Sequence, residues 1–402
     1  MQGSSGLGAL KVPAFRRYFA GSVLGMNATW IFRVLLSWSA WDLTHSASFV
    51  GLVAALSLLP VALTGPVFGA LTDRADVRRA FFRVTLGFTL CPLIFMLLSW
   101  TGWLAPVPLL VLSGLYGVLL SAYHPVRQSI APRLVEPPLI GSVVALAALN
   151  FNVGRMLSPA IGGALIARIG LVPTSLVVLL LFVPSIVISL TLTPRDSVRT
   201  TARASFLSDL RAGLGVAWRR WPIRRSLLLS VFALGPVRAV AELLALIADG
   251  NFGRGAEGLG LLTSAIGFGA LFAALFQVFA GQALLRRHAV RYGFVALGFL
   301  ATGAMVLAPD FDTALLAAPF AGFSATYVGV SLQIGLQARL EDGMRGRIMS
   351  LWMLATTLST SVLAVAVSAA SDFVGLAPAA LTAAGLGALA VLAIALRRGD
   401  DE

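Results

Sequence analysis

Charged residues are scarce in this chain of 402 residues. They make up 12% of it, whereas 58% of the residues are hydrophobic and the mean hydropathy is +0.90. Soluble domains carry about 25% charged residues, so this composition excludes an ordinary globular protein. The useful unit for reading the chain is therefore the apolar span, not the soluble domain.

Cysteine and histidine are also scarce. Cys91 is the single cysteine, so no disulfide can form within the chain. His45, His124 and His288 lie far apart in sequence and give no metal-ligand spacing. No nucleophile–base arrangement and no Gly-x-x-x-x-Gly-Lys-Ser/Thr phosphate loop is present. We therefore expect no cofactor, no metal and no enzyme activity, and nothing favours drive by ATP.

Twelve apolar runs are long enough to cross a bilayer. The first begins after Arg17 and is longer than the core of a secretory signal peptide. The sequence predicts an all-α integral membrane protein with spans at 18–41, 47–71, 81–102, 106–124, 139–167, 170–193, 225–248, 257–285, 292–308, 313–338, 348–370 and 373–396.

The basic residues fall on one side of these spans. The N-terminus, the loops after even-numbered spans and the C-terminus hold 25 of the 30 basic residues, and the other loops hold only Arg168 and Arg254. The positive-inside rule therefore places both termini in the cytoplasm. The net charge of +13 could indicate nucleic-acid binding, but topology accounts for it, so we expect no nucleic-acid partner.

One long polar connection divides the chain into residues 1–193, a linker at 194–224, and residues 225–402. Phe206, Leu210, Leu214 and Trp218 recur every four residues in the linker, with arginines beside them. This spacing favours an amphipathic helix on the anionic inner leaflet, and a flexible linker is the alternative.

The two flanking segments are weakly repeated. Arg133-Leu134 follows the fourth span, and Arg339-Leu340 follows the tenth, 206 residues later. Such an offset is typical of parallel six-span repeats. We therefore expect two pseudo-symmetric six-helix bundles.

The loop after the second span carries a recognisable signature. Residues 69–79 include Gly69, Asp73, Arg74 and Arg78 at the spacing Gly-x-x-x-Asp-Arg-x-x-x-Arg. This resembles the signature loop of the major facilitator superfamily, although Asp76 replaces its usual glycine. The acid at that position is similar to the branch of macrolide-efflux and enterobactin-exporter-like proteins. The resemblance implies a bacterial inner-membrane transporter that works by alternating access.

The resemblance also implies a cytoplasmic gate. Asp73 lies at the inner end of the second span, where an arginine or a helix N-terminus of the other half could meet it. Gly69, Arg74 and Arg78 would belong to the same gate. A solvated turn with basic residues for topology is the alternative.

The fifth span carries a stretch of small residues, namely Gly154, Ser158, Pro159, Gly162 and Gly163. Their spacing resembles a motif associated with exporters of the superfamily, with Ser158 in place of a glycine. Small residues allow close helix packing, and a proline allows a bend. The motif favours export over import, and ordinary small-residue packing is the alternative.

Four ionisable residues lie well inside spans: Arg33, Arg155, Arg238 and Glu242. Such charges are costly and usually face a path or a partner. Arg238 and Glu242 are four residues apart and could pair, with or without a role in transport. Glu242 is the candidate proton carrier, because the resemblance implies proton coupling. Three cations against one acid favour an anionic or electron-rich substrate.

Uncharged polar residues could also line the path. Asn27, Asn152, Gln333 and Gln337 lie inside spans, and hydrogen bonding between helices is an equally good interpretation of them.

The sequence therefore predicts a monomeric secondary active transporter that couples protons to export of a small organic molecule, drug-like or siderophore-like. The alternatives are an uncoupled facilitator or lipid flippase on the same fold, and a membrane sensor that no longer transports.

Overall fold

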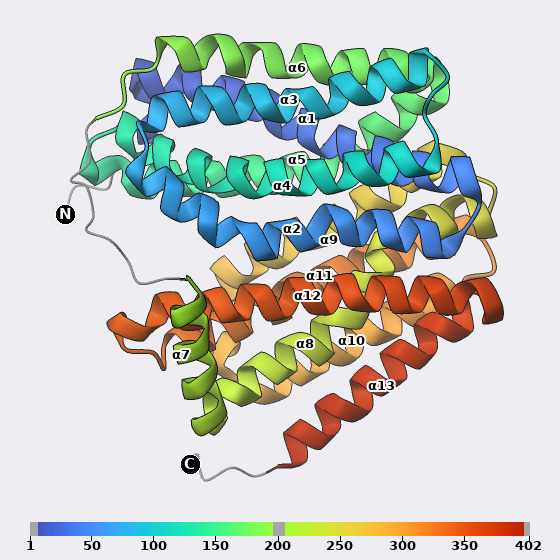
Figure 1. Cartoon of the computed structure of the whole chain (residues 1–402). Helices are drawn as coiled ribbons and strands as arrows, with labels where there is room; N and C mark the ends of the chain where they lie inside the picture. Colours follow the sequence, from blue (N-terminus) through green and yellow to red (C-terminus); the bar gives the residue numbers. More distant parts are fainter. Residues whose placement is uncertain (1–6, 196–205, 398–402) are drawn as a thin grey trace.

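A computed structural model describes residues 7–195 and 206–397, and within these ranges the chain is helical without β-strands (Figure 1). The long helices are α1 (Pro13–Thr44), α2 (Ala47–Arg74), α3 (Val77–Trp100), α4 (Pro106–Ile130), α5 (Ile140–Ile169), α6 (Leu171–Thr191), α7 (Phe206–Arg219), α8 (Trp221–Glu242), α9 (Gly255–Arg286), α10 (His288–Val306), α11 (Phe311–Gln337), α12 (Asp342–Val374) and α13 (Leu376–Leu396).

Eleven helices in the described ranges are long and apolar enough to cross a membrane. The expected seventh span, α8, falls outside this set because Arg224, Arg225, Arg238 and Glu242 all lie within its 22 residues. It nevertheless packs inside the bundle against α11, α12 and α13. The expected count of twelve is thus one above the number that length and composition support.

The helices form two groups, α1–α6 and α8–α13, which meet along α5 with α9 and α2 with α12 (Figure 1). The start of α1 and the end of α13 lie at the same end of the bundle, here called the proximal end, as does α7. The opposite end is called the distal end. Within the linker, α7 is a helix of 14 residues that lies beside the proximal parts of α8 and α12.

Two glycines make the internal repeat visible in the backbone. Gly170 joins α5 to α6 with φ 82°, and Gly375, 205 residues later, joins α12 to α13 with φ 84°. Side chains other than glycine rarely adopt such angles. Each half therefore turns at the same place by the same device, which supports the pseudo-symmetric arrangement.

The small residues of α5 serve two contacts. A Cβ atom at Gly154 or Gly162 would meet α1, at Met26 and Ile31 respectively. A Cβ atom at Gly163 would instead meet the backbone of Ala256 and Gly260 in α9, which belongs to the other half. The motif thus packs α5 against its own bundle on one face and against the opposite bundle on the other.

Pro159 lies inside α5 at this contact. Proline lacks an N–H and disturbs the helical hydrogen bonds around it. The backbone N–H of Ala160 donates to the hydroxyl of Ser264 in α9, with 2.8 Å between N and Oγ. A backbone donor beside the proline thus has a partner across the interface, as the interior of a membrane requires.

The distal end is fastened by Asp372, near the end of α12. Its carboxylate accepts hydrogen bonds from the backbone N–H groups of Ala47 (2.9 Å) and Ser48 (3.2 Å), at the start of α2. The Ser46 hydroxyl also donates to it (3.4 Å). A negative charge at a helix N-terminus is favourable, so a carboxylate of one half caps a helix of the other.

A second distal contact joins α1 to the segment after α8. The indole Nε1 of Trp41 donates to Oδ2 of Asp249 at 2.8 Å, while the backbone N–H of Gly255 donates to Oδ1 at 3.0 Å. All hydrogen bonds and ion pairs described between the two groups lie in the distal parts of their helices. Toward the proximal end, α2 and α12 diverge (Figure 1).

Replacement of Gly163 by alanine should weaken the α5–α9 contact. The new Cβ atom would collide with backbone atoms of α9, and overpacking of this kind costs about 1–3 kcal/mol. Thermal unfolding can be followed with a thiol dye at Cys91, which is buried in the fold. Gly141→Ala on the same helix is the control, because nothing lies within 4 Å of its Cβ position. Equal melting temperatures for both variants would contradict the packing role.

Replacement of Asp372 by asparagine should loosen the distal end. Loss of the charged acceptor should cost roughly 1 kcal/mol, or about fivefold in the ratio of open to closed molecules. Spin labels at Thr101 and Leu307, in a Cys91→Ser background, would report the distal separation by pulsed electron resonance. Asp310→Asn is the control, since Asp310 caps α11 within its own half. Distances unchanged from the wild type in Asp372→Asn would sink the assignment.

Candidate functional site

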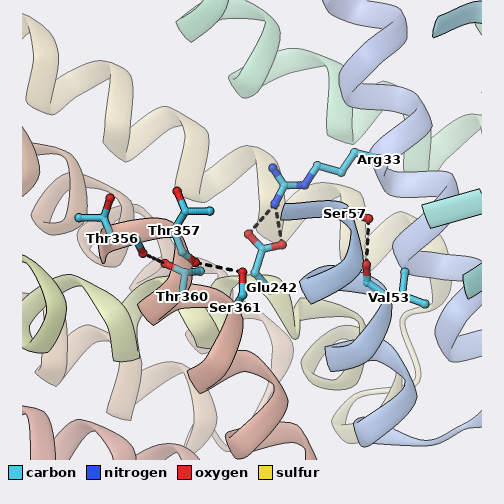
Figure 2. Close-up of polar contacts among 8 residues, drawn as sticks. All are labelled: Arg33, Val53, Ser57, Glu242, Thr356, Thr357, Thr360 and Ser361. Carbon is cyan, nitrogen blue, oxygen red and sulfur yellow. Dashed lines mark hydrogen bonds and ion pairs between the residues drawn. The ribbon is translucent and has the colours of Figure 1, made fainter. Parts of the chain in front are cut away.

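Glu242 is the last residue of α8, where the helix breaks before a π-helical turn at Leu246–Asn251 (η4). Its two carboxylate oxygens lie 2.5 and 2.6 Å from Nη2 of Arg33 in α1 (Figure 2). Both side chains keep accessible surface, 34% for Arg33 and 17% for Glu242. Arg33 lies eleven residues before the end of α1, or about 16 Å from the distal end at 1.5 Å per residue. The pair therefore joins the two halves deep in the bundle.

This pairing differs from the one that sequence spacing favoured. Arg238 and Glu242 are four apart on α8, but the described ion pair of Glu242 is with Arg33. Glu242 ends its helix, and the break there lets its side chain cross to α1. Spacing along one helix could not reveal a partner from the other half.

Arg155 and Arg238 come from opposite halves, on α5 and α8. Both side chains are partly exposed, and within the described ranges neither makes a hydrogen bond or an ion pair. A Cβ atom at Gly154, the residue before Arg155, would lie 3.5 Å from Trp30 of α1, and the guanidinium of Arg33 lies over that Trp30 ring. On α8, Arg238 comes one helical turn before Glu242. The centre of the bundle thus holds three cations and one anion.

Hydroxyl groups flank Glu242 on α2 and α12 (Figure 2). Ser57 donates to the carbonyl of Val53 (2.8 Å), and Thr360 and Ser361 donate to the carbonyls of Thr356 and Thr357 (3.0 Å each). Their protons are committed to their own helices, and all three residues are buried.

The uncharged candidates are two asparagines with described hydrogen bonds and two partly exposed glutamines. Asn27 donates to the Val23 carbonyl (2.7 Å) and accepts from the Ser158 hydroxyl (2.6 Å), and Asn152 donates to the Ala148 carbonyl (2.8 Å). Ser158, which stands where the resembling motif has glycine, thus fastens α5 to α1. Gln333 and Gln337 are partly exposed on α11. No polar contact described for these four residues reaches the Arg33–Glu242 pair.

The side-chain hydrogen bonds described for the loop between α2 and α3 lie within its own half. The side chains of Asp73 and Arg74 lie outside the described set, and Gly69 faces open space. Arg78 donates to the carbonyl of Leu190 at the end of α6, within its own half. The gate therefore stays a prediction.

Asp76, which departs from the resembling signature, has a structural role in the same loop. Its carboxylate accepts from the backbone N–H of Arg79 at 3.0 Å and caps α3. That hydrogen bond holds the pKa of Asp76 below its usual value. The residue thus stays charged at neutral pH and marks the start of α3.

Arg127 is a partly buried cation inside α4 that the sequence interpretation missed. Its Nη2 donates to the hydroxyl of Ser22 (2.6 Å), which also accepts from Asn150 (3.2 Å), and its guanidinium stacks over the ring of Tyr123 at 5.2 Å. The predicted fourth span ended at residue 124, so Arg127 was counted as a loop residue, whereas α4 continues to Ile130. Sequence offered no signal for the role of Asp372, which lay in a two-residue loop between predicted spans.

No metal centre is apparent in the part of the chain that the structure describes, because no three His, Cys, Asp or Glu side chains are suitably grouped there.

Comparisons with known proteins agree with this architecture. The chain is 27% identical over 355 residues to the enterobactin exporter EntS of Escherichia coli O127:H6. The alignment covers 85% of this chain and 81% of that protein. It is 28% identical over 152 residues to a staphyloferrin A transporter of Staphylococcus aureus NCTC 8325. That alignment covers 37% of this chain and only 38% of the staphyloferrin A transporter.

A solved structure extends the comparison to the fold. The nucleoside transporter NupG superposes with a TM-score of 0.73 at 10% identity, covering 95% of this chain and 98% of that one. Residues 4–400 match the family described as "Transmembrane secretion effector" (MFS_3). The chain therefore belongs to this family of the major facilitator superfamily and is a multi-pass membrane transporter.

Proposed function

We propose that this protein exports a small organic molecule by alternating access and that Glu242 couples a proton to the cycle. The observation that carries the proposal is the Arg33–Glu242 pair, which joins the two halves on the distal side of the bundle. The proximal end is the cytoplasmic one in this proposal, since most basic residues lie there.

Opening of the distal end requires α1 and α8 to separate. Breaking this partly buried ion pair leaves two charges without a partner inside the membrane, which is unfavourable. A proton on Glu242 removes one of these charges and so lowers the cost of opening. Proton binding from outside would thus favour the outward-open state, and reformation of the pair would favour the state closed at the distal end.

Export is the direction supported by the α5 motif and by the enterobactin exporter among the relatives. A siderophore-like cargo is compatible with the staphyloferrin A transporter as a further relative. The proposed gate at Gly69, Asp73, Arg74 and Arg78 would close the proximal end in the opposite state, when α2 and α12 approach each other there.

Glu242→Gln should separate the proton from the cargo. In proteoliposomes, the wild type should accumulate enterobactin or staphyloferrin A when a pH gradient is imposed. The variant should exchange the same cargo across the membrane without responding to the gradient, because glutamine cannot carry a proton at this site. Glu257→Gln is the matched control, since Glu257 is exposed in the first turn of α9.

Three results would contradict parts of this proposal. Full accumulation by Glu242→Gln would remove Glu242 from the coupling step. Equilibration without accumulation by the wild type would favour the uncoupled facilitator. Absence of flux across a broad panel of cargo would favour a sensor.

A further inference from the structure

The charged centre of the bundle is out of balance. Arg33 is paired with Glu242, but Arg155 and Arg238 have no acidic partner among the described residues. Two cations without counter-charge in a membrane interior are costly, and proteins keep such groups where they serve a ligand or a path. The imbalance is therefore informative about what enters the site.

Both unpaired arginines keep accessible surface, Arg155 in the middle of its helix and Arg238 one turn before the break at the end of α8. Arg155 is the sixteenth of the 30 residues of α5, and Arg238 is the eighteenth of the 22 residues of α8. They arise from opposite halves: Arg155 follows Gly154, which packs against Trp30 beneath the Arg33 guanidinium, and Arg238 lies one turn before Glu242, the partner of Arg33. A ligand that binds both guanidinium groups would bridge the two bundles.

A glycine makes room for one of these groups. Gly329 on α11 is buried, and a Cβ atom at that position would lie 3.1 Å from Nη2 of Arg238. The absent side chain lets the guanidinium lie against the α11 backbone. Arg238 is thus seated on one wall, while Arg155 projects from a helix of the other half.

We propose that Arg155 and Arg238 form a two-part anion site for an organic molecule with at least two separated carboxylates. Guanidinium groups bind carboxylates through paired, charge-assisted hydrogen bonds. Two separated anionic groups match two arginines on different helices better than one compact ion does. The inference names the substrate class of the proposed transporter and rests on that proposal only for the claim that the ligand is carried.

Glu242 sets the capacity of this site. While its carboxylate holds Arg33, two guanidinium groups are free for ligand, and its neutralisation would release a third.

Ligand binding to the purified full-length protein tests the inference without any transport. Citrate and succinate are the probes, with acetate, inorganic phosphate and tetraethylammonium for comparison, and binding is measured by calorimetry. Citrate and succinate should bind more tightly than the other three. Arg155→Gln and Arg238→Gln should each weaken citrate binding about tenfold or more, because each removes charged hydrogen bonds.

Two further variants separate a ligand site from a general effect of charge. Arg225→Gln, on the same helix as Arg238 but bonded to Tyr292, should leave citrate affinity unchanged. Glu242→Gln should tighten citrate binding, because Arg33 becomes available. A merely structural role for the arginines would not produce opposite effects at residues 238 and 242.

The inference is overturned if phosphate or tetraethylammonium binds as well as citrate, or if Arg155→Gln and Arg238→Gln behave like Arg225→Gln. Citrate binding that depends on both arginines, without flux in proteoliposomes, would uphold the site and contradict the transport proposal. Proton-coupled flux of a neutral or cationic cargo, without citrate binding, would uphold the transport proposal and contradict the anion site.

Discussion

The high cost of an unpaired charge inside a membrane is the constraint on which the rest of this structure depends. One acid, Glu242, is available for three central arginines, and it is shared across the two halves with Arg33. The ion pair, the cap of α2 by Asp372 and the glycine contact of α5 with α9 all join the halves distally. Each contact is small or polar, so under the proposed alternating access each would break when the halves separate. In that proposal a closed distal end is stable and also reversible.

Charge also connects the proposed cargo to the driving force. A membrane potential contributes about 2.3 kcal/mol per elementary charge per 100 mV. A negative interior therefore pushes a dicarboxylate outward, and the proton on Glu242 would not have to supply the whole driving force. In this account the proton acts mainly on the pair between the halves, whereas the cargo neutralises Arg155 and Arg238.

The sequence predicted the fold well because a membrane restricts the possible structures. Composition and periodicity alone predicted the spans, the alternation of basic loops and the offset of 206 residues between the halves. The positive-φ turns at Gly170 and Gly375 agree with that repeat. The site was predicted only as a set of separate residues. Arg33, Arg155, Arg238 and Glu242 were identified by their depth, but the partner of Glu242 was not, because contacts between α1 and α8 leave no local pattern. Arg127 was missed through an error of six residues at the end of one span.

The most direct test of the account is a double-mutant cycle on Arg33 and Glu242, with the ratio of open to closed distal ends as the readout. Spin-label distances at the distal end would be compared for the wild type, Arg33→Gln, Glu242→Gln and the double variant. The account predicts that each single change opens the distal end and that the double variant opens it no further, with a coupling energy of about 0.5–3 kcal/mol. Additive effects of the two changes would show that the pair does not hold the halves together and would contradict the account.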